Sequence, residues 1–293
     1  MSRTTGGDTA DQARLLISGR DGPGIVAAAS NILTSHGANI ISLNQHSTDS
    51  QGGSFFQRAV FHLDQLADER AALEVDLHRG LAERFGLQWE MFDVAAPKRV
   101  ALFVSKLDHC LLDLLWRHGG GDIPMNPTMI VSNHTDLEWI ANRFGVPFHH
   151  IPVQGDRKQR AEEAQLELLK GNVDVMVLAR YMQILSADFL TAIDVPVINI
   201  HHSFLPAFVG ASPYRQAKQR GVKLIDATAH FVTEDLDEGP IIEQDVVRVS
   251  HTDSAENLSR RGMDVERMVL ARAVTAFCED RIMRDGNSTV VFP

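Results

Sequence analysis

The chain has 293 residues, of which 44% are hydrophobic and 23% charged, and a formal net charge of -10 at pH 7. A chain of this length is expected to form about two domains, and its composition is that of a globular protein. The acidic balance argues against a general nucleic-acid surface, and no stretch approaches the roughly 20 apolar residues of a membrane-spanning helix. We therefore expect a cytoplasmic protein without nucleic-acid or membrane partners, which begins with a disordered tail at residues 1–12.

Cysteine and histidine spacing gives little support for a disulfide or a metal centre. The only cysteines, Cys110 and Cys278, form no CxxC or Cys/His ligand pattern, which predicts reduced, packed thiols. Histidine pairs occur at 149–150 and 201–202, and a site completed by Asp237 is a minority alternative. Neighbouring residues on a strand point to opposite faces, so we predict no metal and no cofactor.

The first folded segment, residues 13–94, alternates strand and helix patterns in the order βαββαβ. Apolar alternation or helical spacing predicts strands and helices, in chain order, at 14–18, 25–36, 39–47, 55–63, 66–85 and 87–94. This order is the ferredoxin-like arrangement. Asp21-Gly-Pro-Gly-Ile25 follows the first strand and Ala38-Asn-Ile-Ile-Ser42 opens the second, and with this element order the segment resembles an ACT domain.

The ACT resemblance implies regulation and self-association. Such domains commonly pair side by side and bind small amino acids at the pairing interface. We therefore expect a homo-oligomer, a dimer or tetramer, with glycine or methionine as the first candidate effectors. The resemblance places the effector site at Asp21, Gly22, Pro23, Gly24, Ile25 and Asn39. The alternative is that the domain only holds the oligomer together.

After a linker at 94–98, strand and helix patterns alternate again along a second domain, residues 99–293. The expected elements, in chain order, are 99–104, 110–118, 129–132, 136–144, 148–153, 157–170, 173–178 and 195–200. This alternation is typical of a Rossmann-like, doubly wound and mostly parallel sheet with helices on both faces. Two later strands, at 225–232 and 241–249, and a long amphipathic helix at 255–284 complete the domain.

Polar side chains end the strand at 195–200. Asn199 and His201 are two residues apart, so they point to the same face of the sheet. In open α/β sheets the ligand crevice lies beyond the carboxyl ends of the strands. Downstream, Thr233-Glu-Asp-Leu-Asp-Glu-Gly-Pro240 is a carboxylate-rich turn between two strands, and Asp237 is the member that we single out.

The stretches Asn199-Ile-His-His-Ser-Phe-Leu-Pro206 and Leu236-Asp-Glu-Gly239 resemble the formyltransferase family that uses 10-formyltetrahydrofolate. The resemblance places Asn199, His201 and Asp237 at the catalytic positions. In chemical terms, the Asn199 amide can donate a hydrogen bond to the oxyanion that forms on the formyl carbon. His201 can protonate the leaving amine, and Asp237 can orient the imidazole or take a proton from the nucleophile.

The folate subsite follows from the same resemblance. Leu178-Ala-Arg-Tyr-Met-Gln-Ile-Leu185 is similar to the segment with which the family holds the pterin ring. This implies substrate contacts from one side by Met182, Gln183, Ile184 and Leu185, and from the other side by Asp235 and Leu236.

The acceptor side departs from the family pattern. Val104-Ser-Lys-Leu-Asp-His109 contains no Gly-rich loop, whereas family members that formylate glycinamide ribonucleotide use one to hold the phosphate. The resemblance then implies that water replaces the amine, with hydrolysis of 10-formyltetrahydrofolate to formate and tetrahydrofolate in one-carbon and purine metabolism. The polar candidates for the water side are His202, Ser203, Lys106 and His109. Transfer to an amine acceptor such as glycinamide ribonucleotide and a non-catalytic sensor of folate and amino acids remain the alternatives.

Overall fold

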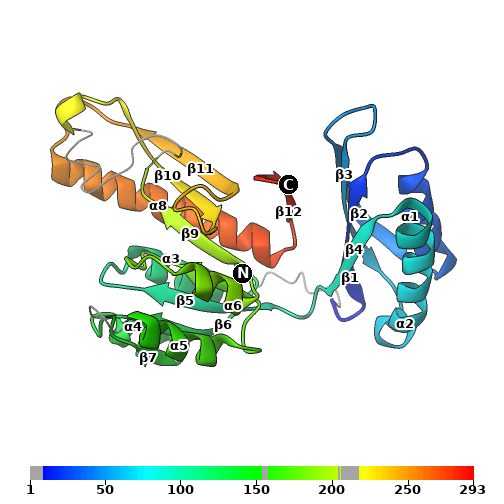
Figure 1. Cartoon of the computed structure of the whole chain (residues 1–293), viewed down its shortest axis with the longest axis horizontal. Helices are drawn as coiled ribbons and strands as arrows, with labels where there is room; N and C mark the ends of the chain where they lie inside the picture. Colours follow the sequence, from blue (N-terminus) through cyan, green and yellow to red (C-terminus); the bar gives the residue numbers. More distant parts are fainter. Residues whose placement is uncertain (1–8, 154–157, 204, 206–217) are drawn as a thin grey trace, which may run out of the picture. The chain divides into compact units, whose positions relative to one another are not determined.

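The computed structural model describes residues 9–153, 158–203, 205 and 218–293 of the chain. The chain divides into two compact units (Figure 1). Unit 1 consists of Met1–Pro97, Glu279–Asp285 and Val290–Pro293, and unit 2 consists of Lys98–Cys278 and Gly286–Thr289. Residues 1–8 of the expected tail lie outside the described residues, and the first strand already begins at Gln12.

Unit 1 is built on a four-stranded antiparallel sheet in the order β2-β3-β1-β4. Its elements are β1 (Gln12–Arg20), α1 (Ile25–Ser35), β2 (Asn39–Ser47), β3 (Ser54–His62), α2 (Leu66–Leu77), the π-helical turn η1 (His78–Glu83) and β4 (Gln88–Asp93). The predicted ferredoxin-like order is confirmed. The turn into α1 needs Gly24, because its φ of 91° is a left-handed conformation that side chains disfavour.

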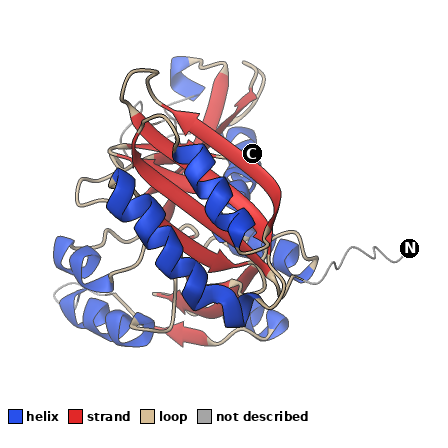
Figure 2. Cartoon of the chain, turned by 90° about the vertical axis from the view of Figure 1, so that its right-hand side faces the viewer, coloured by secondary structure: helices blue, strands red, loops and turns tan. Residues whose placement is uncertain are grey.

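Both long helices of unit 1 cover one face of the sheet (Figure 2). Ala13, Leu15 and Ile17 alternate along β1 and are fully buried. They form one core with apolar side chains of both helices, such as Leu33 and Leu73. The apolar side chains on one face of β1 and on one side of α1 and α2 therefore form a single hydrophobic layer.

The opposite face of this sheet is covered by the C-terminal residues, which corrects the expected domain boundary. Leu16 and Phe56 point away from the helices and pack against Met283 and Phe292. The sequence patterns place all of 99–293 in the second domain, whereas Glu279–Asp285 and Val290–Pro293 belong to unit 1. The helix predicted at 255–284 also ends earlier, at Cys278. It is followed by β12 (Ile282–Asp285) and β13 (Ser288–Val291).

A buried ion pair holds this C-terminal segment on the sheet. Arg14 Nη1 lies 3.1 Å from Asp280 Oδ2, and the two side chains are only 10% and 5% exposed. Arg58 donates hydrogen bonds to the carbonyl oxygens of Asp280 and Glu279, at 3.0 and 2.8 Å. Burial, followed by the neighbouring Arg14, lowers the pKa of Arg58. Asp280 thus contacts Arg14 through its carboxylate and Arg58 through its backbone carbonyl.

Replacing Asp280 by alanine is expected to destabilise unit 1 by about 3 kcal/mol, because it leaves Arg14 buried without its carboxylate. Hydrogen exchange of the β1 amides measures this, since it reports the stability of that sheet separately. Asp64→Ala is the matched control, because the Asp64 side chain in the same unit is 94% exposed. Equal exchange rates in the two variants would show that the ion pair does not hold the segment.

Unit 2 contains a seven-stranded sheet in the order β11-β10-β9-β8-β5-β6-β7. Its strands are β5 (Lys98–Val104), β6 (Met125–Ser132), β7 (Phe148–His150), β8 (Val175–Leu178), β9 (Val197–His201), β10 (Leu224–Phe231) and β11 (Ile241–Arg248). Strands β5 to β9 pair in parallel, whereas β9, β10 and β11 pair antiparallel. The predicted mostly parallel sheet is confirmed, with the later strands as its antiparallel extension.

Helices cover both faces of this sheet, as predicted for a doubly wound domain. They are α3 (His109–Gly119), α4 (Glu138–Phe144), α5 (Lys158–Leu169), α6 (Ala187–Ile193) and α8 (Ala255–Cys278). Helices α5 and α6 share one core with Phe103 and Val197. On the other face, Phe277 of α8 packs edge-on against Phe231 of β10. Val197, Asn199 and His201 are spaced two residues apart along β9, so they share one face of the sheet. Because Val197 packs in the core with α5 and α6, the polar pair lies on the side of these helices.

Two further expectations concern cysteines and membranes. Cys110 and Cys278 are free and buried, as predicted for packed thiols. Within the described parts of the chain, no helix combines the length and the apolar character that crossing a bilayer requires.

Candidate active site

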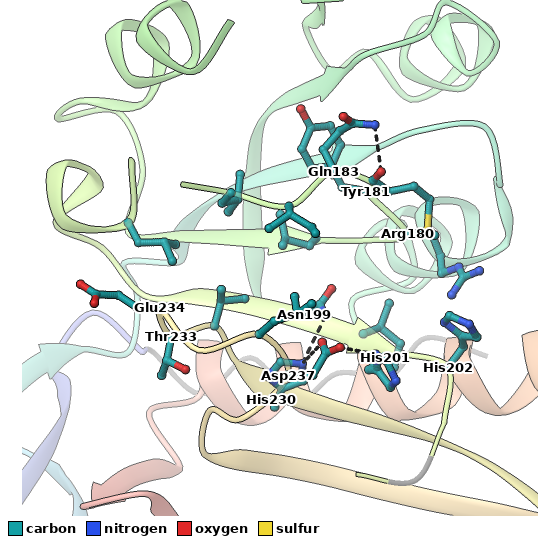
Figure 3. A pocket seen from close by; sticks show the side chains of 18 residues that line it. Arg180, Tyr181, Gln183, Asn199, His201, His202, His230, Thr233, Glu234 and Asp237 are labelled. Carbon is teal, nitrogen blue, oxygen red and sulfur yellow. Dashed lines mark hydrogen bonds and ion pairs between the residues drawn. The ribbon is translucent and has the colours of Figure 1, made fainter. Parts of the chain in front are cut away.

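A cavity of about 430 Å³ lies where β8 and β9 end (Figure 3). Its described lining combines apolar side chains with a small group of polar ones. The polar and aromatic members are Arg180, Tyr181, Gln183, Asn199, His201, His202, His230, Thr233, Glu234 and Asp237. Such a mainly apolar cavity with a few convergent polar groups is the usual form of a small-molecule site.

Strand pairing brings the first polar group together. Asn199 of β9 lies opposite His230 of β10, and His201 lies opposite Thr228. Residues directly opposite in an antiparallel pair share a face, so both histidines and the amide point into the same cavity. Asn199 Nδ2 lies 3.2 Å from His230 Nε2, and His230 Nδ1 donates to the Phe231 carbonyl oxygen at 2.9 Å. The second amide hydrogen of Asn199 is left for a ligand.

The turn that carries Asp237 is fixed by its glycine and its backbone. Asp237 adopts a left-handed φ of 59°, which aspartate tolerates better than most side chains. At Gly239 a Cβ atom would lie 1.8 Å from the Phe231 carbonyl oxygen, so only glycine fits. The Phe231 amide donates to the Pro240 carbonyl oxygen at 2.9 Å. The close approach of this turn to β10 places the Asp237 carboxylate beside the two histidines.

Asp237 contacts both imidazoles. Its Oδ2 lies 3.3 Å from His201 Nδ1, and its Oδ1 lies 3.6 Å from His230 Nε2. The hydrogen bond from His201, and then the contact with His230, hold the pKa of the Asp237 carboxyl well below its usual range. The carboxylate therefore stays ionised and fixes a proton on His201 Nδ1. His201 Nε2, which lies 2.8 Å from Ser203 Oγ, is the nitrogen that can accept and pass on a proton.

The loop that follows β8 is held by three side chains, one directly after β5 and two on α5. The Met182 amide donates to Ser105 Oγ at 3.0 Å, and Gln165 Nε2 donates to the Tyr181 hydroxyl at 2.9 Å. Burial raises the pKa of Tyr181 to about 12. Glu162 accepts hydrogen bonds from the backbone and the hydroxyl of Ser186, where α6 begins. The apolar side chains of this loop are therefore presented to the cavity on a fixed backbone.

A charged group closes the other end of the cavity. Arg180 has a left-handed φ of 67°, and its guanidinium lies beside His202 (Figure 3). Arg180 Nε lies 3.4 Å from Glu266 Oε2, and His109 Nε2 lies 2.8 Å from the same oxygen. The rings of His201 and His202 stack with centroids 5.2 Å apart. Burial, and then the charge of Arg180, lower the pKa of His202 to about 4, so this imidazole is neutral near pH 7.

Metal-ligand atoms come together at one place among the described residues. His109, Cys110 and Glu266 offer atoms within 4.8 Å of one another. Burial keeps the pKa of the Cys110 thiol well above its ordinary value, and Arg180 already provides the cation beside Glu266. The arrangement of His109, Cys110 and Glu266 is therefore better explained by a protonated thiol beside an ion pair than by a metal site. His149 and His150 lie on β7, at the edge of the sheet opposite to the β11 edge.

Acid is expected to destabilise the folded protein through His202. The unfolded chain gains this proton as the pH falls below about 6.5, whereas the folded protein gains it only near 4. Stability is therefore lost as the pH decreases through this window. Urea unfolding at pH 7 and at pH 5 should show a smaller acid loss for His202→Gln than for the wild type. The exposed His251→Gln is the control, and an equal loss in His202→Gln would contradict the expectation.

The cavity gathers most, though not all, of the residues predicted from the sequence. Those that line it are Asn199, His201, Asp237, His202, Met182, Gln183, Ile184, Leu185 and Leu236. Ser203 reaches the site only through its hydrogen bond to His201, and His109 only through Glu266. Lys106 and Asp235 are exposed and do not belong to the described lining. The substrate contacts predicted for these two residues stay predictions.

The predicted effector residues lie in unit 1, around a second and more open cavity of about 920 Å³. Asp21, Gly22, Pro23, Gly24 and Ile25 line it together with residues of β2 and of the loop before β3. Asn39 does not belong to the described lining, because it lies at the opposite end of β2, where it pairs with His62. The effector contact predicted for Asn39 stays a prediction.

Sequence reasoning missed His230 and Arg180. His230 is the one titratable side chain in the apolar run from Ala227 to Val232, which was a usable signal. Its position opposite Asn199 depends on the antiparallel register of β10, which local patterns do not reveal. Arg180 looks like a polar residue in a loop, and nothing local indicates its buried partner Glu266, 86 residues later.

The fold and the site define a formyl transferase type of domain joined to an ACT domain. Residues 98–274 match the family model described as formyl transferase, and residues 13–77 match the ACT domain model. A relative from Mycobacterium bovis, named formyltetrahydrofolate deformylase, is 57% identical over 283 residues, which cover 97% of this chain and 91% of the relative. The chain belongs to the formyltetrahydrofolate deformylase family.

Solved structures support the same assignment. A formyltetrahydrofolate deformylase from Burkholderia mallei matches with a TM-score of 0.90 and 46% identity, covering 97% of this chain and 100% of that one. A glycinamide ribonucleotide transformylase from Symbiobacterium toebii matches with a TM-score of 0.63 and 34% identity, covering 67% of this chain and 95% of that one. The transformylase therefore resembles a part of the chain, whereas the deformylase resembles nearly all of it.

Proposed function

We propose that the protein hydrolyses 10-formyltetrahydrofolate to formate and tetrahydrofolate, and so supplies one-carbon and purine metabolism. The observation that carries this proposal is the convergence of Asn199, His201 and Asp237 on one cavity beside the fixed loop after β8. The apolar side chains of Met182, Ile184 and Leu236 provide surfaces for the pterin ring. No cofactor is needed, because water and two proton transfers complete the reaction.

The proposed roles follow from the geometry. Water adds its oxygen to the formyl carbon, and the second amide hydrogen of Asn199 stabilises the oxyanion that forms. His201, held by Asp237, takes the proton from water through Nε2 and delivers it to the leaving nitrogen. The carbon to nitrogen bond then breaks, which releases tetrahydrofolate and formate.

The acceptor side supports hydrolysis over transfer to a nucleotide amine. Residues 105–108 between β5 and α3 contain no glycine that could bring backbone amides around a phosphate. His202, neutral and half-buried, lines the cavity next to His201. We therefore assign water as the acceptor.

The test is an assay without any acceptor amine. Purified protein incubated with 10-formyltetrahydrofolate is expected to release formate at a rate well above the blank, and added glycinamide ribonucleotide is expected to change nothing. Formylation of the nucleotide would place the protein among the transferases. Absence of both reactions, with folate binding intact, would indicate a sensor.

We also propose that a small amino acid, glycine or methionine, regulates this activity from unit 1. The Asp21 carboxylate lines the second cavity and can pair with an ammonium group. Titration of each amino acid against hydrolysis should change the rate several-fold in the wild type, as a coupling of about 1 to 3 kcal/mol requires. Asp21→Asn should weaken this response, and Asp68→Asn, an exposed change in the same unit, should not. An unresponsive wild type would leave unit 1 with only a structural role.

A homo-oligomer fits the surface of unit 1, and we propose a dimer or tetramer. Strand β2 occupies an edge of the sheet, and its Ile41 and Leu43 are 52% and 36% exposed. An unpaired edge with apolar side chains favours pairing with a second copy. Sedimentation of the wild type and of Ile41→Lys tests this, since the charge should shift the protein toward the monomer. We also propose a cytoplasmic location, which the two buried free thiols support.

A further inference from the structure

Arg180 is a buried cation that the hydrolytic mechanism does not use. Its side chain is only 10% exposed, yet it lines the cavity of the active site. Its Nε is buried and makes no hydrogen bond to any described residue, because the Glu266 carboxylate at 3.4 Å is an ion-pair contact only. An arginine carries five N–H donors, so a guanidinium held in this way has donors to offer to a ligand.

The partners of Arg180 hold it in place. Glu266 on α8 is only 1% exposed, and its Oε2 contacts both Arg180 and His109. The backbone at Arg180 is left-handed, with a φ of 67°. Because the carboxylate approaches the Nε edge, the terminal amino groups of the guanidinium form the fork that remains for a small ligand.

The surroundings of the fork suit a small anion beside the reacting carbon. Figure 3 shows the guanidinium over His202, on the side away from Asp237. His202 in turn stacks on His201. Only the His202 side chain therefore separates the fork from the imidazole that transfers the proton. Because His202 carries no charge near pH 7, it places no second buried cation beside the fork.

We propose that Arg180, beside His202, forms a subsite for the carboxylate of formate, the product released when the formyl group is hydrolysed. This inference rests on the proposed function. Formic acid is a carboxylic acid and loses its proton well below neutral pH, so the product carries a charge that the neutral formyl group lacked. A planar guanidinium matches the two oxygens of a carboxylate. The subsite therefore draws the product away from the formyl position once the carbon to nitrogen bond has broken.

Direct binding of formate tests the subsite without folate present. The intact protein is titrated with carbon-13 labelled sodium formate, and binding is followed by broadening of the formate resonance. Sodium acetate and sodium chloride at equal ionic strength compete in parallel samples. Arg180→Gln is expected to weaken formate binding by about 10-fold or more, and the exposed Arg143→Gln, an equal change in charge, is expected to leave it unchanged.

A second variant shows whether a loss of formate binding in Arg180→Gln is caused by misfolding. Arg180→Lys retains the cation that Glu266 needs but removes the fork, and it should still bind formate less tightly than the wild type. Equal formate affinity in the wild type and in folded Arg180→Gln or Arg180→Lys would overturn the inference, as would equal competition by chloride. Formate binding through Arg180 in a protein without hydrolytic activity would refute the proposed function and leave the subsite standing.

Discussion

Asp237→Asn is expected to lower kcat by roughly 100-fold to 10,000-fold, the range of acid-base groups. The amide keeps the shape of the carboxylate but loses the charge that now faces His201 and His230. Without it, the proton on His201 Nδ1 is no longer fixed and Nε2 is not reliably free to accept. Steady-state formate release measures the effect.

The controls separate chemistry from folding. Glu238→Gln removes an exposed carboxylate one residue away and should retain near wild-type turnover. The double variant Asp237→Asn with His201→Ala should be little slower than either single variant, because the two residues act as a unit. Near-normal kcat in Asp237→Asn, or fully additive losses in the double variant, would contradict the proposed roles.

Asn199→Ala is expected to lower kcat by roughly 100-fold to 1,000-fold, which is the effect of one oxyanion donor. The loss should appear in kcat and not in the binding of folate, because the amide contacts the formyl oxygen most strongly in the transition state. Single-turnover kinetics and equilibrium folate binding measure the two quantities separately.

Asn199→Asp sharpens this test. It has nearly the same size as asparagine but sets a carboxylate where the oxyanion forms, so it should be at least as slow as Asn199→Ala. If Asn199→Asp retained wild-type turnover, the donor role of this residue would be excluded. Unfolding measurements on both variants check that the loss of the contact to His230 has not unfolded the site.

The parts of the fold that the sequence predicted are those with local causes. The Gly-Pro-Gly turn at 22–24 and the apolar run within 14–18 are signals within a few residues, and the structure confirms the ferredoxin-like order that they indicated. Asn199 and His201 could be predicted to share a face because the period of a strand is two. The position of Asp237 beside them depends on a contact between distant parts of the chain. Only the family resemblance predicted it.

The parts that could not be predicted depend on distant partners. The helical pattern after Ala255 gives no local stop signal near Cys278, since no glycine or proline follows at once. The chain turns at Asp280, whose left-handed φ of 52° is maintained in a buried ion pair with Arg14. The same holds for Arg180, because its partner Glu266 lies on a helix that begins far downstream.

The return of the C-terminal residues to unit 1 sets the timing of folding during synthesis. Arg14 and Asp280 are separated by 266 positions, so the ribosome must translate nearly the whole chain before the second face of the first sheet can be covered. At a typical elongation rate this delay is on the order of 10 to 50 s. During this time the C-terminal side chains that pack against Leu16 and Phe56 have not yet been synthesised. The nascent N-terminal domain is therefore exposed to aggregation for most of translation. A chaperone that shields this face on the ribosome should raise the yield of folded protein more than one that acts after release.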